Sequence, residues 1–252
     1  MTNAFRNAIH RKTVNTESWF QGRGVYGGLV FAQMAVEVSH QSRFPIRRLT
    51  VDMCAPVATG DLEIQVTEVR SGANSQFFYV ACLQEGKVVA HGTTVCGGGR
   101  LGDFDAHNFE MPQSTVPTMP SIPQNPLMPK FTQHFEYWPT IGPFPFSRSK
   151  DLNCGGWIRS RHDQTIDVPM ILSLMDAWWP SVSLGLNGPR PMGTISFTVD
   201  VCFDEPFEQT EPCLLYNTCS EVQDGYAIEN NMLWSASGKL LGRAQQNVVI
   251  IR

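Results

Sequence analysis

The sequence repeats one order of elements on either side of a proline-rich stretch. In each half, an apolar segment with helical spacing precedes four runs that are typical of β-strands. Residues 49–54 (LTVDMC) align with 197–202 (FTVDVC) at an offset of 148 (197 − 49), and 86–89 (GKVV) align with 238–241 (GKLL) at an offset of 152 (238 − 86). Two matches in the same order, each behind a helix, indicate an internal duplication.

The pattern predicts the elements of both copies. A helix is expected over 29–40 in the first copy and within 168–182 in the second, where Pro180 closes it. The predicted strands cover residues 47–55, 61–71, 75–84 and 87–96, then 193–203, 212–222, 225–234 and 239–251. Turn residues separate them, as at Glu85-Gly86 and Asp224-Gly225.

A helix followed by a four-stranded antiparallel meander can bury the apolar side of the helix against the sheet. One copy alone leaves a sheet edge unpaired, and two copies can join edges into one long sheet. The predicted fold is therefore α+β, a double hotdog with two units fused in one chain. Prolines mark the connection, which predicts a first unit over 1–110, an extended linker over 111–130 and a second unit over 131–252.

Charge and hydropathy exclude several classes of function. The formal net charge is −4 and no basic run interleaves with aromatic residues, so we expect no nucleic-acid partner. No apolar stretch approaches the roughly 18 residues of a membrane span, and the N-terminus lacks an apolar signal core, which predicts a cytoplasmic protein. The histidines and cysteines form no ligand motif, so neither a metal nor a cofactor is expected.

Two segments carry a resemblance to a known family. The motif GGLVFAQ (27–33) and the run 47–94 resemble the first half of the acyl-CoA thioesterase II family. The second half is similar through Asp176, the strand SFTVDVCFDEP (196–206) and the terminal GRAQQNVVI (242–250). The resemblance implies hydrolysis of acyl-CoA to free acid and CoA, with no cofactor. Because hotdog sheets often associate, we expect a homodimer.

The resemblance also implies a catalytic set. In that family, an aspartate on the second helix, a serine or threonine on the next strand and a glutamine on the last strand hold the hydrolytic water. These roles fall here on Asp176, Ser196 and Gln246. A register difference of two residues gives the hydroxyl role to Thr194 or Thr198, and a difference of one reverses the face and removes the hypothesis.

The residue types suit the chemistry. Asp176 lies in the apolar run LSLMDAWWP, where a buried carboxylate costs several kcal/mol unless it is paired or hydrogen-bonded. It can act as a general base, with Ser196 and Gln246 orienting the water. Backbone N–H groups at a helix start can hold the thioester oxygen. The segment Gly27-Gly28 and the start of the second helix are both candidates.

Other predicted substrate contacts, which include Thr198 on the polar face of its strand, compete with ordinary structural roles. Trp178 either lines an acyl pocket or packs in the core, and Arg48, with its neighbour Arg47, either contacts CoA phosphates or is solvated. At the strand offsets, Gly28 aligns with Asp176, Arg48 with Ser196, and Thr94 with Gln246. The first copy therefore lacks the catalytic residues, and we expect one active site per chain.

Two other functions remain open at this point. A hydratase or dehydratase acting on acyl thioesters needs a histidine beside a carboxylate, and His162-Asp163 is the candidate pair. A non-catalytic acyl-CoA binding protein is the third possibility. The sequence does not distinguish acyl-chain lengths, or CoA from carrier-protein thioesters.

Overall fold

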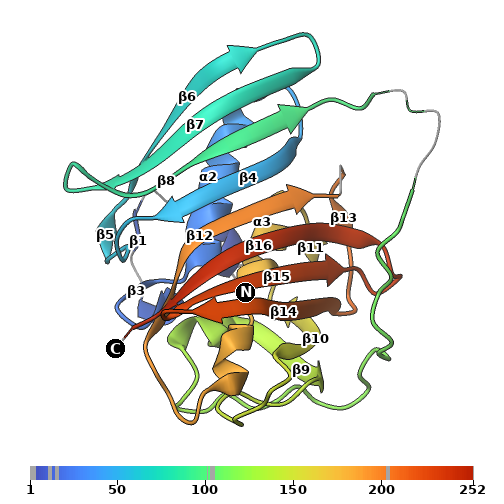
Figure 1. Ribbon diagram of the computed structural model, residues 1–252. Coiled ribbons are helices and arrows are strands. Elements are labelled where there is room, and N and C mark those ends of the chain that lie inside the picture. Colours follow the sequence, from blue (N-terminus) through green and yellow to red (C-terminus); the bar gives the residue numbers. More distant parts are fainter. Residues whose placement is uncertain are drawn as a thin grey trace.

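The computed structural model describes residues 4–10, 13–14, 17–100, 102, 106–202 and 205–251. Its centre is a ten-stranded antiparallel sheet in the order β6-β7-β8-β4-β12-β16-β15-β14-β10-β9. Two helices, α2 (Gly27–Gln41) and α3 (Val168–Asp176), lie together on one face of this sheet (Figure 1). The predicted α+β double hotdog is confirmed.

Each copy contributes a helix and a series of strands to this sheet. The first copy supplies α2 and the strands β4 (Ile46–Met53), β6 (Glu63–Ser71), β7 (Ser75–Gln84) and β8 (Lys87–Gly97). The second supplies β9 (Phe135–Ile141), β10 (Asn153–Ser160), α3, β12 (Met192–Val201), β14 (Cys213–Gln223), β15 (Tyr226–Trp234) and β16 (Leu240–Ile250). The shorter elements are α1 (Ala4–Ile9), β1 (Thr13–Val14), η1 (Glu17–Trp19), β2 (Phe20–Gln21), β3 (Gly24–Val25), β5 (Gly60–Asp61), η2 (Lys130–His134), β11 (Thr165–Ile166), η3 (Ser181–Gly185) and β13 (Phe207–Glu208).

Three details differ from the sequence prediction. The second helix ends at Asp176, shortly before the predicted stop at Pro180, because this proline has no N–H to bond the carbonyl of Asp176 four residues earlier. The short helix η3 follows after Pro180. Strands β9 and β10 were not predicted; β9 contains Pro139, which is tolerated because β9 is an edge strand. The last residue of the predicted strand 193–203, Phe203, lies outside the described residues.

The two copies meet at strands β4 and β12. Thr50 pairs with Thr198, and their hydroxyl oxygens are 3.2 Å apart. These residues are 148 positions apart (198 − 50), the offset of the duplication, so the approximate twofold axis passes between them. On the same ladder, Arg48 pairs with Asp200 through an ion pair of 2.6 Å.

A β-bulge occurs at the same place in both copies. In β12 the register shifts between Thr194 and Ser196, and in β4 it shifts between Ile46 and Arg48. A bulge inserts one residue and changes which face the following side chains point to. Thr194 therefore pairs with Val248, which is fully buried on the helix side, whereas Ser196 points to the opposite face.

The connection between the copies runs along the second unit (Figure 1). Among its described residues, 98–100, 102 and 106–129, there is no helix or strand. It is held by backbone and side-chain bonds, such as the one from Trp138 Nε1 to the carbonyl of Met119 at 2.8 Å. The unit boundaries at 110 and 130 stay a prediction.

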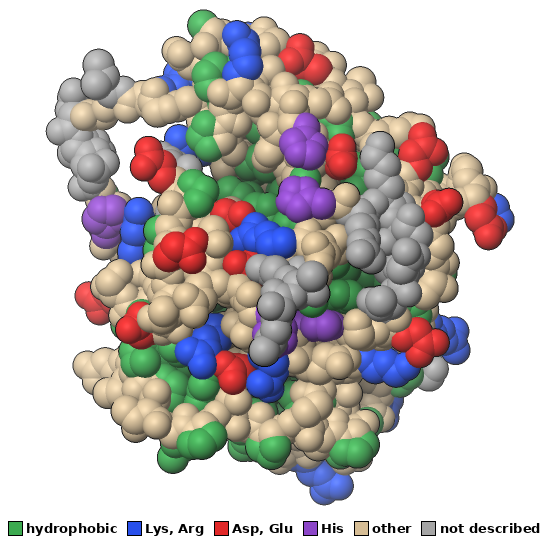
Figure 2. Space-filling model, turned by 180° about the vertical axis from the view of Figure 1, so that it is seen from behind, with side chains coloured by type: hydrophobic (Ala, Val, Ile, Leu, Met, Phe, Trp, Pro, Cys, Tyr) green, Lys and Arg blue, Asp and Glu red, His purple; other side chains and the backbone are tan. Residues whose placement is uncertain are grey.

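The surface viewed from the helix side carries mixed charge. Lysine and arginine side chains alternate there with aspartate and glutamate (Figure 2). In the described part of the chain, no helix combines the length and the apolar character that crossing a bilayer requires.

Candidate active site

Asp176 is the last residue of α3 and is only 8% exposed. Its Oδ2 accepts a hydrogen bond from the backbone N–H of Gly28 at 2.8 Å, and its Oδ1 accepts one from Gln246 Nε2 at 3.3 Å. Burial raises the pKa of this carboxyl to about 7, while the two hydrogen bonds oppose the rise. A carboxyl with such a pKa exchanges protons readily near neutral pH, as a general base must.

Gln246 connects Asp176 to two further side chains. Its Nε2 also donates to Thr194 Oγ1 at 2.5 Å, and its Oε1 accepts from Asn231 Nδ2 at 3.1 Å. Both N–H bonds of the amide are thus used, which fixes the orientation of its oxygen and nitrogen. Asp176, Gln246 and Thr194 form one hydrogen-bonded group.

The hydroxyl in this group belongs to Thr194 and not to Ser196. Ser196 pairs with Asn247 and lies beside Phe197, whose ring is buried against Phe31 of α2 with centroids 5.0 Å apart. Since neighbouring strand residues point to opposite faces, the Ser196 side chain lies on the face away from Asp176. The bulge at Ile195 returns Thr194 to the helix side.

The amino end of α2 approaches Asp176 closely because two glycines begin the helix. A Cβ on Gly27 would lie 2.8 Å from Asp176 Oδ2, and one on Gly28 would lie 2.2 Å from the Tyr26 hydroxyl. The first backbone N–H groups of a helix lack acceptors within it and carry partial positive charge. The first copy thus brings a helix start to the carboxylate of the second.

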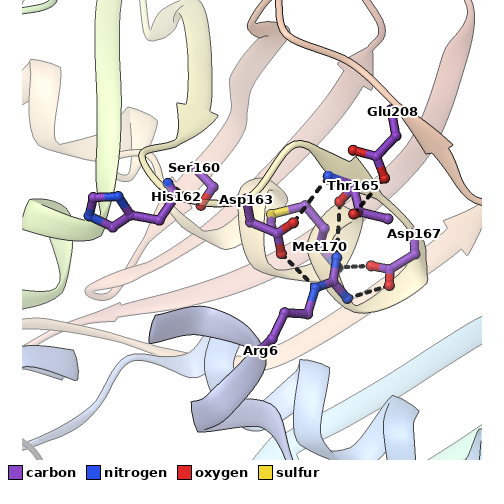
Figure 3. A network of polar contacts seen from close by, with 8 residues as sticks. All are labelled: Arg6, Ser160, His162, Asp163, Thr165, Asp167, Met170 and Glu208. Atoms are coloured by element: carbon purple, nitrogen blue, oxygen red, sulfur yellow. Dashed lines mark hydrogen bonds and ion pairs between the residues drawn. The ribbon is translucent and has the colours of Figure 1, made fainter. Parts of the chain in front are cut away.

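The start of α3 is not available in the same way. Asp167 caps it by accepting from the N–H of Met170 at 3.0 Å, and Pro169 has no N–H. Arg6 of α1 covers this end, bonding Asp163 at 2.5 Å and also Asp167 (Figure 3). Of the two helix starts considered from the sequence, only that of α2 faces Asp176.

The pair His162-Asp163 does not form an acid–base unit. Asp163 binds Arg6, and the His162 side chain points in another direction (Figure 3). Asp163 Oδ1 also accepts from the backbone N–H of Thr165 at 3.1 Å. The aspartate therefore anchors the segment that leads into α3.

The predicted substrate contacts divide between the two faces of the sheet. Gly27 and Gly28 lie beside Asp176, and the buried Trp178 follows it by two residues in the chain. Thr198 and Arg48 lie on the opposite face, where they contact Thr50 and Asp200. The structure therefore separates them from the group around Asp176, and the solvated alternative fits Arg48.

Two buried polar residues near this group were missed from the sequence. Asn231 contacts Gln246, and Glu229 pairs directly with Gln246 between β15 and β16. Glu229 is fully buried, and its carboxylate accepts from the N–H groups of Ser181 at 2.9 Å and Val182 at 2.8 Å; burial raises its pKa to about 7. Alternation offered a signal, because both residues share the face of Ala227 and Leu233.

Fold and site together define a double-hotdog protein whose polar centre lies between its two helices. Family models give the assignment: the acyl-CoA thioesterase N-terminal domain matches residues 15–97, and the C-terminal domain matches residues 112–250. The chain belongs to the acyl-CoA thioesterase family, and it is an acyl-CoA thioesterase. A search of curated proteins found no match.

Solved structures share the complete fold. A hot dog fold protein of unknown function from Alicyclobacillus acidocaldarius superposes with a TM-score of 0.88 at 23% identity, covering 100% of this chain and 99% of the other. An acyl-CoA thioesterase II, TesB2, from Mycobacterium marinum superposes with a TM-score of 0.76 at 15% identity, covering 98% of each chain.

Proposed function

We propose that the chain hydrolyses acyl-CoA thioesters with a water molecule held by Asp176, Thr194 and Gln246. The observation that carries this is the shared amide: Gln246 Nε2 bonds both Asp176 Oδ1, at 3.3 Å, and Thr194 Oγ1, at 2.5 Å. The two N–H bonds of an amide diverge by about 120°, so these oxygens are roughly 5 Å apart, a gap that one water can bridge.

Each group in this arrangement has a defined task. Thr194 accepts from Gln246, so its own hydroxyl proton is free to donate to the water. Asp176 in its ionised form accepts a proton from the same water. Gln246 keeps both oxygens in place and is itself held by Asn231.

The reaction then follows from these positions. The water oxygen attacks the thioester carbon while its proton moves to Asp176, and negative charge develops on the carbonyl oxygen. The N–H at the start of α2 that remains is that of Gly27, because Gly28 already binds Asp176. Collapse of the tetrahedral intermediate breaks the C–S bond, and Asp176 returns the proton to the CoA thiolate.

The other two functions receive less support. A hydratase needs a histidine beside the carboxylate. In the candidate pair from the sequence, Asp163 binds Arg6 and the His162 side chain points in another direction (Figure 3). A binding protein does not need a desolvated carboxyl whose pKa lies near 7. Fatty acid metabolism, a cytoplasmic location and a homodimer stay predictions.

The test is thiol release from acyl-CoA, followed with a thiol reagent, on two matched variants. Thr194→Val removes the hydroxyl on the helix side, and we expect kcat to fall about 100-fold, as for loss of one water-orienting group. Ser196→Ala removes a hydroxyl two residues away on the opposite face and is expected to change kcat less than about 2-fold. Equal losses in the two variants contradict the assignment, and full activity of Asp176→Asn contradicts the mechanism.

A further inference from the structure

Tyr26 immediately precedes α2, and its side chain crosses to the other helix. The ring is fully buried and stacks on Phe131, with centroids 4.1 Å apart and planes tilted by 2°. Its hydroxyl donates to the backbone carbonyl of Ser173, three residues before Asp176, and lies 3.4 Å from the Ser173 hydroxyl. Tyr26 therefore joins the start of α2, in the first copy, to the last turn of α3, in the second.

The carbonyl of Ser173 takes its donor from outside its own helix. Carbonyls in the last turn of an α-helix lack the usual N–H from four residues later. Here the N–H of Ala177 bonds the carbonyl of Leu174, at 3.2 Å, instead of that of Ser173. Since Ser173 is fully buried, loss of the Tyr26 hydroxyl would leave this acceptor unpaired in the core.

The residue before a helix also decides which acceptor the first N–H groups of that helix meet. A serine or aspartate at this position accepts from the second or third N–H of its own helix, as Asp167 does for α3. In α2 the second N–H is that of Gly28, which bonds Asp176 Oδ2 at 2.8 Å. Tyr26 forms no such cap, so it leaves this N–H to the carboxylate.

Tyr26 and Gly28 fit each other closely. A Cβ on Gly28 would overlap the Tyr26 hydroxyl and would lie 3.0 Å from the Ser173 carbonyl oxygen. The start of α2 thus makes two contacts with the end of α3: the hydroxyl bond to Ser173 and the N–H bond to Asp176. Because a single residue separates Tyr26 from Gly28 in the chain, a change in the first contact is passed to the second.

We propose that Tyr26 is a positioning residue: its hydroxyl fixes the start of α2 on the last turn of α3 and so holds the Gly28 N–H against Asp176. The inference rests on the proposed hydrolysis at Asp176. Without the hydroxyl, the two helix ends move apart and the hydrogen bond from Gly28 weakens. The N–H of Gly27, the proposed donor to the thioester oxygen, moves with it.

This role predicts a change in proton affinity as well as in rate. The Gly28 N–H stabilises the charged form of Asp176 and opposes the rise of its pKa, and Gln246 does the same. Tyr26 and Tyr137 also face this carboxyl, and both stay neutral because burial raises their pKa values. Moving Gly28 away therefore raises the pKa of Asp176 further.

The test compares Tyr26→Phe with the matched control Tyr137→Phe, using thiol release from acyl-CoA by the full-length protein between pH 5 and pH 9. Tyr137 is also buried, and its hydroxyl donates to the carbonyl of Ala177 at the end of α3, at 3.1 Å. It comes from β9 of the second copy, so its bond does not involve α2. Each variant loses one buried hydroxyl, and urea unfolding is expected to show similar losses of stability.

Only Tyr26→Phe is expected to change the reaction. Its kcat should fall about 10-fold with KM changed less than about 2-fold, because a donor to the transition state is displaced rather than removed. Its apparent pKa in kcat/KM should rise by about half a pH unit, the effect of weakening one hydrogen bond. Tyr137→Phe should keep kcat within about 2-fold and the apparent pKa within about 0.2 units, since the Gly28 N–H stays in place.

Wild-type kcat and apparent pKa in Tyr26→Phe overturn the proposal while hydrolysis at Asp176 stands. Equal changes in both phenylalanine variants also overturn it, because any bond lost at this helix end would then act alike. Gly28→Ala keeps the N–H but displaces the hydroxyl, so it should change kcat and the apparent pKa in the same directions. It decides the question if Tyr26→Phe does not fold, and unchanged values in it contradict the role of Tyr26. No thiol release by the unmodified protein removes the proposed hydrolysis together with this role.

Discussion

Replacing Asp176 by asparagine is expected to stop hydrolysis and to stabilise the fold above neutral pH. The carboxyl is 8% exposed and receives two hydrogen bonds, and no cation among the described residues pairs with it, so its charge is poorly compensated. An asparagine keeps the size and an acceptor oxygen for the Gly28 N–H, and it has no charge to bury. Function and stability therefore oppose each other at this position.

The magnitude follows from the pKa. Burial raises it from 3.8 to about 7, so between these values the folded protein holds a proton that the unfolded chain has lost. Stability from this group is fully present below pH 4 and is lost as pH rises through 7. The slope is about 1.4 kcal/mol per pH unit up to the folded pKa of about 7 and falls to zero above it. The loss between pH 5 and pH 8.5 therefore accumulates over about two units and is roughly 3 kcal/mol.

Urea denaturation of the wild type and of Asp176→Asn at pH 5 and pH 8.5 measures this effect. We subtract the unfolding free energy of the wild type from that of Asp176→Asn at each pH. This difference is expected to be roughly 3 kcal/mol larger at pH 8.5 than at pH 5. Taking the difference removes the contribution of Glu229, which titrates in both proteins. A difference that stays constant over this range would show that Asp176 is not desolvated in the fold.

Three further results are expected. The kcat/KM of the wild type should rise with pH and level off with an apparent pKa of about 7, since Asp176 must be ionised; a flat profile from pH 5 to 8.5 contradicts its role as base. Gly27→Ala should lower kcat about 100-fold in the thiol-release assay, because the new methyl lies 2.8 Å from Asp176 Oδ2 and displaces it; normal kcat excludes this close approach. Arg6→Met should reduce the unfolding free energy measured in urea by about 2 kcal/mol, because Asp163 and Asp167 lose the cation that they share; a change below about 0.5 kcal/mol means that these ion pairs contribute little.

The sheet was predictable because strands with alternating burial are separated by strong turn residues. Glu85-Gly86 and Asp224-Gly225 form turns with positive φ at all four positions, at the places predicted for them. The duplication also predicted that the copies join into one long sheet, and the structure adds that they meet where Thr50 pairs with Thr198. The duplication made the order of helix and strands easier to predict, because the same order appears in both copies.

The choice of hydroxyl was not predictable from alternation. A bulge at Ile195 changes the face of every residue before it in the strand. No residue type in the sequence of this strand marks the position of the bulge. The helices were also misaligned by the strand offset. Since α2 begins at Gly27 and α3 at Val168, the helix offset is 141 (168 − 27), and Asp176 corresponds to Ala35 rather than to Gly28.

The corrected alignment shows that the first copy lacks the whole polar group. Each of the three residues of the second copy that hold the proposed water has an apolar or shorter counterpart: Ala35 for Asp176, Ile46 for Thr194 and Thr94 for Gln246. The shared bulge supports the second match, because it lies at equivalent places in β4 and β12. These three differences remove the base, the hydroxyl and the amide together.

The starts of the two helices also differ, and the difference matches the loss of the carboxylate in the first copy. Gly28 donates its N–H to Asp176, whereas its counterpart Pro169 has no N–H to offer Ala35. At one end of the helix pair both partners of this contact are present, and at the other end both are absent. A second carboxylate there would be buried with no donor to compensate it, at a cost of several kcal/mol. The two copies therefore form the proposed site jointly: the first supplies the helix start and the second supplies Asp176, the proposed base.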